Sequence, residues 1–354
     1  MTEVARKAGV SVATVSRVLN DSAPVNETTR TRVEDAVRSL RYVPHGAARS
    51  LITRRTSTFG VILPDLYGEF FSEVIRGLDE AAREHGYHLL VSSAHSDLAE
   101  VESAMRAMRG RVDGLAIMSP DLIAGGAAIK GPENLPIVLV NCDIKHSALD
   151  SVSVDNVGGA QSIVAHLISH GHRRIAIING PERNCDARER LRGYRAALQD
   201  AGLAVAAELE LPGTFTEDSG YDAARSLLKV RKPATAIFAA NDSMAIGAIA
   251  ALTEAGLAVP EDVAVAGFDD IPIGRYLTPS LSSVSVPASD IGSRAIACLV
   301  HATEHKNHHV RRHELVATQL AIRNTCGPHD YPRRQGAAAS RSSLNAPTPI
   351  EAVP

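Results

Sequence analysis

Residues 4–20 read VARKAGVSVATVSRVLN, and this stretch predicts two short helices joined by a tight turn. Gly9 can end the first helix in a left-handed conformation, and Ser11 can cap the start of the second. Within the second helix, one apolar face at i, i+3, i+4 spacing consists of Val15, Val18 and Leu19. This face can pack inward against the first helix.

The opposite face of the second helix is small and polar, with a single basic side chain. It carries Ala13, Ser16, Arg17 and Asn20, with Val12 beside Ser16. A capped helix with such a face has what a reader of the DNA major groove needs. The alternative at this point is an ordinary helical hairpin whose polar face is solvated.

The residues that follow favour the DNA-binding interpretation. Asn26 can cap a third helix. The apolar stripe of that helix consists of Val33, Ala36, Val37 and Leu40. Residues 1–56 contain ten Lys and Arg against five Asp and Glu, whereas the whole chain has a net charge of −3. A basic head on an acidic body indicates that only the head has a polyanionic partner.

Several motifs together resemble the lactose-repressor (LacI/GalR) family of bacterial transcription regulators. Besides residues 4–20 they are YVPHGAARSL, FFSEVIRGLDEAAREHGY, VSVDNVGGAQSIVAHLISHGHRRIAIING, RERLRGYRAAL, LAIRNT and the long stretch from AIFAANDSMAIG to FDDIPIGRYLTPSLSSV. They occur in the family's order and cover the chain from Met1 to about Cys326. The resemblance implies a head at residues 1–44 and a hinge at residues 45–56.

For the head, the resemblance agrees with the helical spacing. The side chains expected at base edges are Val12, Ala13 and Arg17, and Arg17 can make a bidentate contact with guanine. Those expected at phosphates are Ser11, Thr14, Ser16 and Asn20. Helix capping or simple exposure is the alternative role for each hydroxyl.

The hinge segment 47–54 is too short to form a stable helix alone, since isolated helices below about 12 residues are marginal. The resemblance implies that Ala48 and Leu51 enter the minor groove, with Leu51 as the apolar wedge. A symmetric pair of hinges could bury its apolar side, so we expect a homodimer on double-stranded operator DNA. His45 stands where the family usually has Asn, and this departure affects a hinge contact to phosphate.

Beyond the head, the apolar pattern predicts an α/β body. Short apolar runs alternate with amphipathic stretches of helical length, which is typical of βαβ units in parallel sheets. The runs are 59–63, 88–92, 115–118, 137–140, 151–154, 175–178, 236–239 and 263–266. The helical stretches are 70–85, 98–109, 157–170, 188–201, 218–230 and 242–255.

So many units exceed one sheet, so we expect a body at residues 57–326 made of two doubly wound parallel-sheet lobes. The resemblance implies a periplasmic-binding-protein-like arrangement. Lobe one would comprise about 57–154 and 283–310, and lobe two about 155–282 and 314–326. The tail 327–354 has no apolar period, and we expect it to be disordered.

Polar and aromatic groups follow several of the predicted strands, where ligands bind in open α/β sheets. Aromatic rings with Arg, Asn and Asp are suited to a sugar, because rings stack on C–H faces and planar polar groups read hydroxyls. The candidate effector residues are Asp65, Phe71, Asn141, Arg190, Phe215, Asn241 and Asp269. Of Phe70 and Phe71, we expect one to pack and the other to face the cleft. At Asn141 the sequence departs from the Asp-Arg pair common at this strand end in sugar-responsive family members, and the amide keeps hydrogen-bonding capacity but loses the charge. A purine or nucleoside is the alternative effector.

Other chemistries have weaker support in the sequence. The i, i+4 histidines at 301, 305 and 309 could suggest a metal, but a solvated helix end is the better interpretation, and no metal or cofactor is expected. Asp269 and Asp270 are adjacent on a strand, so they point to opposite faces and cannot act as an acid–base pair on one bond. The four cysteines are far apart and are expected to be reduced thiols.

The sequence therefore predicts a sequence-specific transcription regulator, most readily a repressor, controlled by a small polar metabolite. A transporter's periplasmic-type sugar-binding protein is the first rival, but it accounts for neither the basic head nor the missing signal peptide. An α/β enzyme is the second, and no G-x-S-x-G, Walker A or G-x-G-x-x-G motif supports it. With no signal region and no run of eighteen apolar residues, a cytoplasmic location without membrane contact is expected. The first helix begins close to Met1, so we also expect that the native start lies upstream or that Thr2 partly serves as its cap.

Overall fold

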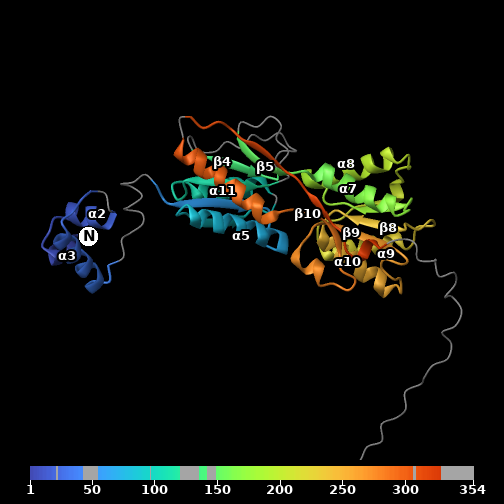
Figure 1. Ribbon diagram of the computed structural model, residues 1–354, viewed down its shortest axis with the longest axis horizontal. Helices are drawn as coiled ribbons and strands as arrows, with labels where there is room; N and C mark the ends of the chain where they lie inside the picture. Colours follow the sequence, from blue (N-terminus) through green and yellow to red (C-terminus); the bar gives the residue numbers. More distant parts are fainter. Residues whose placement is uncertain are drawn as a thin grey trace, which may run out of the picture.

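The computed structural model describes residues 1–20, 23–42, 55–95, 97–119, 135–141, 149–305 and 308–327. Figure 1 shows a small helical head followed by a larger body made of two lobes. Three of the predictions fall outside what the structure describes: the hinge contacts of Ala48 and Leu51, the side chain of Asn20, and the tail from residue 328 onward. The fold is the α/β arrangement that the sequence predicts.

The head consists of three helices, α1 (Thr2–Ala8), α2 (Val12–Asn20) and α3 (Glu27–Ser39). Gly9 ends α1 with φ of 64°, a left-handed conformation that favours glycine. Ser11 Oγ accepts a hydrogen bond from the Thr14 backbone N–H at 3.1 Å, so the predicted cap of α2 is present. Asn26 Oδ1 caps α3 in the same way, accepting from Thr28 N at 2.9 Å.

The head has a hydrophobic core of its own. Its buried residues are Val4, Ala5, Ala8, Val15, Val18, Val33 and Ala36, with Leu19, Val37 and Leu40 packed against them. The inner faces predicted for α2 and α3 are therefore confirmed. Arg32 of α3 donates to the carbonyl oxygens of Ala8 and Gly9, which ties α3 to the turn between α1 and α2.

Lobe one is built on a six-stranded parallel sheet. Its strands are β1 (Thr58–Leu63), β2 (His88–Ser93), β3 (Gly114–Met118), β4 (Ile137–Val140), β5 (Asp150–Val154) and β11 (His313–Val316), in the order β11-β5-β4-β3-β1-β2. The described helices of this lobe are α5 (Glu69–Glu84), α6 (Leu98–Met108) and α11 (Ala288–Glu304). Helices α5 and α11 lie side by side (Figure 1).

Lobe two repeats this plan with one reversed strand. Its strands are β6 (Ile175–Ile178), β7 (Glu210–Leu211), β8 (Ala236–Ala239), β9 (Ala264–Asp269), β10 (Ser282–Ser285) and β12 (Gln319–Ala321), in the order β12-β10-β9-β8-β6-β7. Only the pairing of β10 with β12 is antiparallel among those described in this sheet. Its helices are α7 (Asn156–Ser169), α8 (Cys185–Asp200), α9 (Glu217–Leu227) and α10 (Asp242–Glu254), with short 3₁₀ turns η1 (Ala207–Leu209), η2 (Pro272–Arg275) and η3 (Asn324–Cys326).

The boundaries expected between the lobes need correction at two strands. The resemblance implies that residues 283–310 belong to lobe one, but Ser282–Ser285 pairs with β9 in lobe two. It also implies that residues 314–326 belong to lobe two, but His313–Val316 pairs with β5 in lobe one. The chain therefore crosses between lobes at 155, 286–287 and 317–318. The sequence shows no apolar run at β10, because its buried Ser283 is held by hydrogen bonds rather than by apolar packing.

Candidate functional site

The outer face of α2 is exposed as the DNA-binding interpretation requires. Val12, Ala13 and Arg17 are exposed, while Thr14 and Ser16 are partly buried. The Ser11 hydroxyl both caps α2 and lies 2.9 Å from the Thr14 hydroxyl, so a capping role is present for Ser11. The face is small and carries one long basic side chain, a shape that suits insertion into the major groove.

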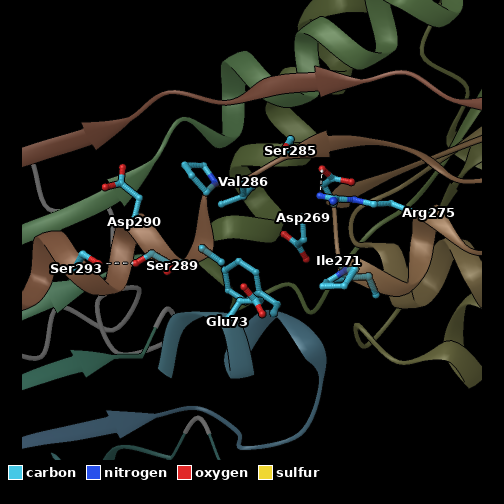
Figure 2. A pocket seen from close by; sticks show the side chains of 14 residues that line it. Glu73, Asp269, Ile271, Arg275, Ser285, Val286, Ser289, Asp290 and Ser293 are labelled. Atoms are coloured by element: carbon cyan, nitrogen blue, oxygen red, sulfur yellow. Dashed lines mark hydrogen bonds and ion pairs between the residues drawn. The ribbon is translucent and has the colours of Figure 1, made fainter. Parts of the chain in front are cut away.

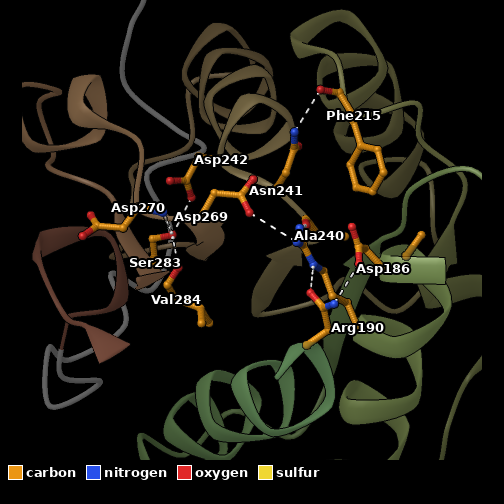
Figure 3. Close-up of polar contacts among 12 residues, drawn as sticks. Asp186, Arg190, Phe215, Ala240, Asn241, Asp242, Asp269, Asp270, Ser283 and Val284 are labelled. Atoms are coloured by element: carbon orange, nitrogen blue, oxygen red, sulfur yellow. Dashed lines mark hydrogen bonds and ion pairs between the residues drawn. The ribbon is translucent and has the colours of Figure 1, made fainter. Parts of the chain in front are cut away.

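In the body, Arg190 of α8 is the centre of a buried polar cluster in lobe two (Figure 3). Its Nε donates to Asn156 Oδ1 at 2.9 Å, and its Nη1 donates to the Ala240 carbonyl at 2.6 Å. The guanidinium carbon lies 3.8 Å from the centroid of the Phe268 ring. These contacts fix Arg190 in place. Because a guanidinium has five N–H donors, it can still donate to a ligand.

Asp269, at the end of β9, is the acidic partner of Arg190. Its Oδ1 lies 3.3 Å from Arg190 Nη2, an ion pair that lacks the alignment of a hydrogen bond. Burial raises the pKa of Asp269 to about 7, while the Arg190 charge opposes this rise. The carboxylate oxygen therefore keeps its capacity to accept a hydrogen bond from a ligand.

The chain turns sharply after β9 and is held there by a buried carboxyl group. Asp269 and Asp270 have φ of 105° and 57°, values that non-glycine residues rarely adopt. The Asp242 carboxyl accepts hydrogen bonds from Ile271 N at 2.8 Å and from Ser283 Oγ at 2.6 Å. Burial, with Asp269 nearby, raises the pKa of Asp242 well above its usual range. Asp242 thus fixes the strained turn that aims Asp269 at Arg190.

Phe215 and Asn241 complete the lobe-two side of the cluster. The Phe215 ring lies 6.0 Å from the Arg190 guanidinium and packs against Gly180. Asn241 donates from Nδ2 to the Phe215 carbonyl at 3.0 Å and caps α10 through Met244 N at 3.0 Å. The capping role weighed for Asn241 in the sequence is therefore present beside its position in the cluster.

Asn141 brings lobe one to this cluster. It follows β4, is buried, and has φ of 50°. Its carbonyl accepts a hydrogen bond from the Cys185 thiol of lobe two at 3.5 Å. Neither Oδ1 nor Nδ2 of Asn141 has a hydrogen-bond partner among the described residues, and the same holds for Asn179 Oδ1 after β6. Buried polar atoms usually have partners, so these atoms retain the capacity to hydrogen-bond a group outside the described residues.

The two remaining candidates do not join the cluster through any contact of the described residues. Asp65 is exposed, and its Oδ1 accepts from Leu66 N and Tyr67 N in a local turn. Phe71 packs edge-on against Phe70, with ring centroids 5.7 Å apart. Phe70 lines a pocket that Phe71 does not. The expectation that the two rings have different roles agrees with this arrangement, with Phe70 and not Phe71 on the pocket.

That pocket has a volume of about 510 Å³ and opens beside Asp269 (Figure 2). Its walls come from α5, from the turn at η2, and from the segment that crosses between lobes from β10 to α11. Polar groups on the walls include Glu73, Ser285 and Ser289. Because Asp269 belongs to both, the pocket adjoins the Arg190 cluster.

The sequence missed two members of the cluster. Asn156 donates to Asp186 Oδ1 at 2.9 Å, and both side chains are buried. Asn156 directly follows the Asp155 cap of α7, and Asp186 lies in the first turn of α8. From the sequence, each residue has the ordinary role of a polar residue at a helix start. The only signal of a site was that these helix starts follow strands.

The histidines form a hydrogen-bonded chain at the end of α11. His301 Nδ1 lies 2.9 Å from His309 Nδ1, and His309 Nε2 lies 2.7 Å from Asp150 Oδ2. The described residues contain no group of three or more His, Cys, Asp or Glu placed to hold a metal. No helix among them is long and apolar enough to cross a membrane.

Comparisons with known proteins agree with both parts of this structure. Residues 1–45 match the family of bacterial regulatory proteins, lacI family, and residues 164–326 match a periplasmic binding protein-like domain. The chain is 35% identical to the HTH-type transcriptional regulator RegA of Clostridium saccharobutylicum over 90% of this chain and 98% of that protein. It is 36% identical to the ribose operon repressor of Escherichia coli (strain K12), over 85% of this chain and 92% of that protein.

A solved structure supports the same assignment. The lac repressor dimer bound to operator and the anti-inducer ONPF aligns with a TM-score of 0.83 at 30% identity, covering 91% of this chain and 97% of that chain. This chain belongs to the lacI family of bacterial regulatory proteins. It is a DNA-binding transcription regulator whose body has the fold of a periplasmic binding protein.

Proposed function

We propose that this regulator is a repressor that binds a near-palindromic operator as a homodimer. The exposed face of α2 supports the DNA contact, with Val12, Ala13 and Arg17 at base edges. Ser11, Thr14, Ser16 and Asn20 would lie at phosphates, and the hinge residues Ala48 and Leu51 in the minor groove. The lac repressor relative is described as a dimer bound to operator, which favours the same assembly here.

The effector is a small polar metabolite, and a sugar or sugar derivative fits the cluster best. The observation that carries this proposal is a set of buried polar atoms on Asn141 and Asp269 that have no hydrogen-bond partner among the described residues. They lie at facing strand ends, beside the fixed guanidinium of Arg190, which is ion-paired with Asp269. Phe215 offers a ring face, and Asn241 a planar amide. Of the sequence candidates, Asp65 and Phe71 have the weakest support from the geometry.

A pentose or a molecule that contains one is the first choice, because a relative with 36% identity is a ribose operon repressor. A nucleoside remains the alternative. Ligand binding would change the closure of the lobes and, through the hinges, the affinity for operator. The match of the head to regulators disfavours a transporter's binding protein, and the named relatives are regulators rather than enzymes. We place its action in the cytoplasm, where the DNA is.

Two measurements on the full-length protein test this proposal. Thermal unfolding is followed with ribose, hexoses, polyols and nucleosides, and a true effector at a hundred times its dissociation constant adds about 2.7 kcal/mol. Operator sequence is found by selecting bound duplexes from a random library, and the selected duplex is then titrated with and without the stabilising compound. A compound that stabilises the protein without changing operator affinity would contradict the regulatory role of the cluster.

A further inference from the structure

A single carboxylate holds the chain where it enters lobe one from the linker. Asp113, just before β3, accepts hydrogen bonds from Thr56 N, at 2.8 Å to Oδ1 and 3.0 Å to Oδ2. Its Oδ1 also accepts from Thr56 Oγ1 at 3.0 Å, and its Oδ2 from Ser57 N at 2.9 Å. The Asp113 backbone N–H donates in turn to the Thr58 carbonyl at 2.8 Å.

These contacts lie outside the sheet itself. The pairing of β1 begins at Thr58 with β2 and at Phe59 with β3, so Thr56 and Ser57 precede the ladder. Ser57 has φ of 50°, which turns the chain at this point, and its carbonyl accepts from His88 N at 3.0 Å. Hydrogen bonds to an ionised acceptor are roughly twice as strong as neutral ones. Asp113 therefore fixes the direction of the chain between the linker and the first residue of β1.

We infer that Asp113 is a positioning residue that fixes the exit of the linker from lobe one, so that movement of this lobe reaches the DNA-binding head. The inference rests on the proposed function. A head on a loosely held linker samples more positions, which lowers the effective concentration of the second head once the first has bound. Loss of the anchor then weakens binding to a full operator but leaves binding to one half-site unchanged.

The test compares full-length Asp113→Ala with the unchanged protein on the selected operator and on the same duplex with one half scrambled. We expect a loss of affinity for the full operator of up to about twofold, because effective concentration falls roughly as the −3/2 power of linker length and the anchor holds only Thr56 and Ser57. The half-site affinity and the effector affinity should be unchanged. Asp97→Ala is the matched control. It removes a carboxylate that accepts a backbone N–H at the start of α6, away from the linker contact, and it should match the unchanged protein on both duplexes.

Hydrogen exchange at the Thr56 and Ser57 amides gives a direct readout of the anchor. Exchange should be faster in Asp113→Ala and unchanged in Asp97→Ala. Thr56→Val removes only the hydroxyl contact and should lose less affinity for the full operator than Asp113→Ala does. Thr56→Ser keeps the hydroxyl and should bind the full operator as the unchanged protein does. This pair of variants tests the anchor even if Asp113→Ala fails to fold. Faster exchange with unaltered operator affinity, or an equal loss on full and half sites, would overturn the inference. An unchanged protein that selects no preferred duplex contradicts the proposed function instead.

Discussion

Arg17 is the long basic side chain on the exposed face of α2, and specific base readout should depend on it. We predict that Arg17→Ala loses about 1–3 kcal/mol of discrimination against random duplex while salt-sensitive binding remains. Competition binding measures this ratio. Arg6→Ala removes an equal charge from α1 and should leave the ratio unchanged. An Arg17→Ala variant as selective as the unchanged protein would refute its placement at base edges.

Arg190 should decide the response to effector, because it joins Asp269, Asn156 and the Ala240 carbonyl in one buried cluster. We predict that Arg190→Ala keeps operator binding but no longer responds to the effector found by thermal unfolding. Operator titrations at increasing effector concentration measure the response. Arg192→Ala, on the exposed side of the same helix, is the control. A normal response in Arg190→Ala would place the effector elsewhere.

Asp269 should make the stability of the effector-free protein depend on pH. Its pKa is about 7 in the folded protein and near 3.8 when unfolded, so between these values the folded state binds the extra proton. The contribution of Asp269 to stability is complete below about pH 4 and is lost as the pH rises through 7, at about 1.4 kcal/mol per pKa unit.

We therefore predict that Asp269→Asn is more stable than the unchanged protein at pH 8 and that its stability varies less between pH 5 and 8. Urea unfolding at four pH values measures both. Asp242 also has a raised pKa, caused first by burial and then by the Asp269 charge, so Asp269→Asn lowers the pKa of Asp242 as well and reduces the pH dependence in the same direction. Parallel pH curves for the two proteins would show that Asp269 is ionised throughout this range.

At the scale of elements, helices α5 and α11 touch through glycines. A Cβ on Gly77 would overlap the Ser289 carbonyl, and one on Gly292 would overlap the backbone of Val74 and Leu78. We predict that Gly77→Ala lowers the free energy of unfolding by about 1–3 kcal/mol, because the helices must move apart. Gly274→Ala, whose new Cβ would find no atom nearer than 3.5 Å, is the control. Equal unfolding midpoints would contradict the close packing.

The elements were predictable where their periodicity was clear, and they were missed where polar contacts replace it. The runs at 137–140, 175–178 and 236–239 coincide with β4, β6 and β8, because these strands are buried on both faces and are apolar throughout. The incorrect lobe boundary at residue 283 came from the family resemblance. No apolar run indicated β10, because Ser282 and Ser283 are buried through hydrogen bonds that involve Thr325 and Asp242.

The positions of the candidate site residues were predictable from the sequence, but the contacts between them were not. Arg190, Phe215, Asn241 and Asp269 each stand near a strand end or a helix start, so the sequence could place them at one edge of lobe two. The sequence could not show that Asp242 holds the turn after β9, because that role depends on contacts with residues 271 and 283. Nor could it show that Phe70, rather than Phe71, lines the pocket, since neighbouring residues of one helix differ only by its rotation.

At the scale of the molecule, a hydrogen bond between α5 and η2 joins the lobes beside the pocket. Glu69 of α5 accepts from Ile273 N of η2 at 2.9 Å. We predict that Glu69→Ala weakens effector binding about threefold to tenfold, because the arrangement in which α5 contacts η2 loses a hydrogen bond of about 1 kcal/mol. Calorimetric titration measures the affinity. Glu69→Gln keeps an acceptor oxygen and should bind nearly normally, while Glu80→Ala is the control for charge on α5. Equal affinities in Glu69→Ala and the unchanged protein would show that this contact does not support closure.

The three crossings between the lobes also govern the order in which a ribosome can deliver a foldable chain. Lobe one starts at β1, but α11 and β11 reach it only after nearly all of lobe two has been synthesised. Until residue 304 has emerged, α5 lacks its complete partner helix α11, and until residue 316 has emerged, β5 lacks its second neighbouring strand, β11. A nascent chain therefore presents an open sheet edge and an uncovered apolar helix for most of its synthesis, the kind of surface that chaperones shield. Lobe two needs its own last strand, β12, only a few residues later, so both lobes are completed almost together at the end of translation.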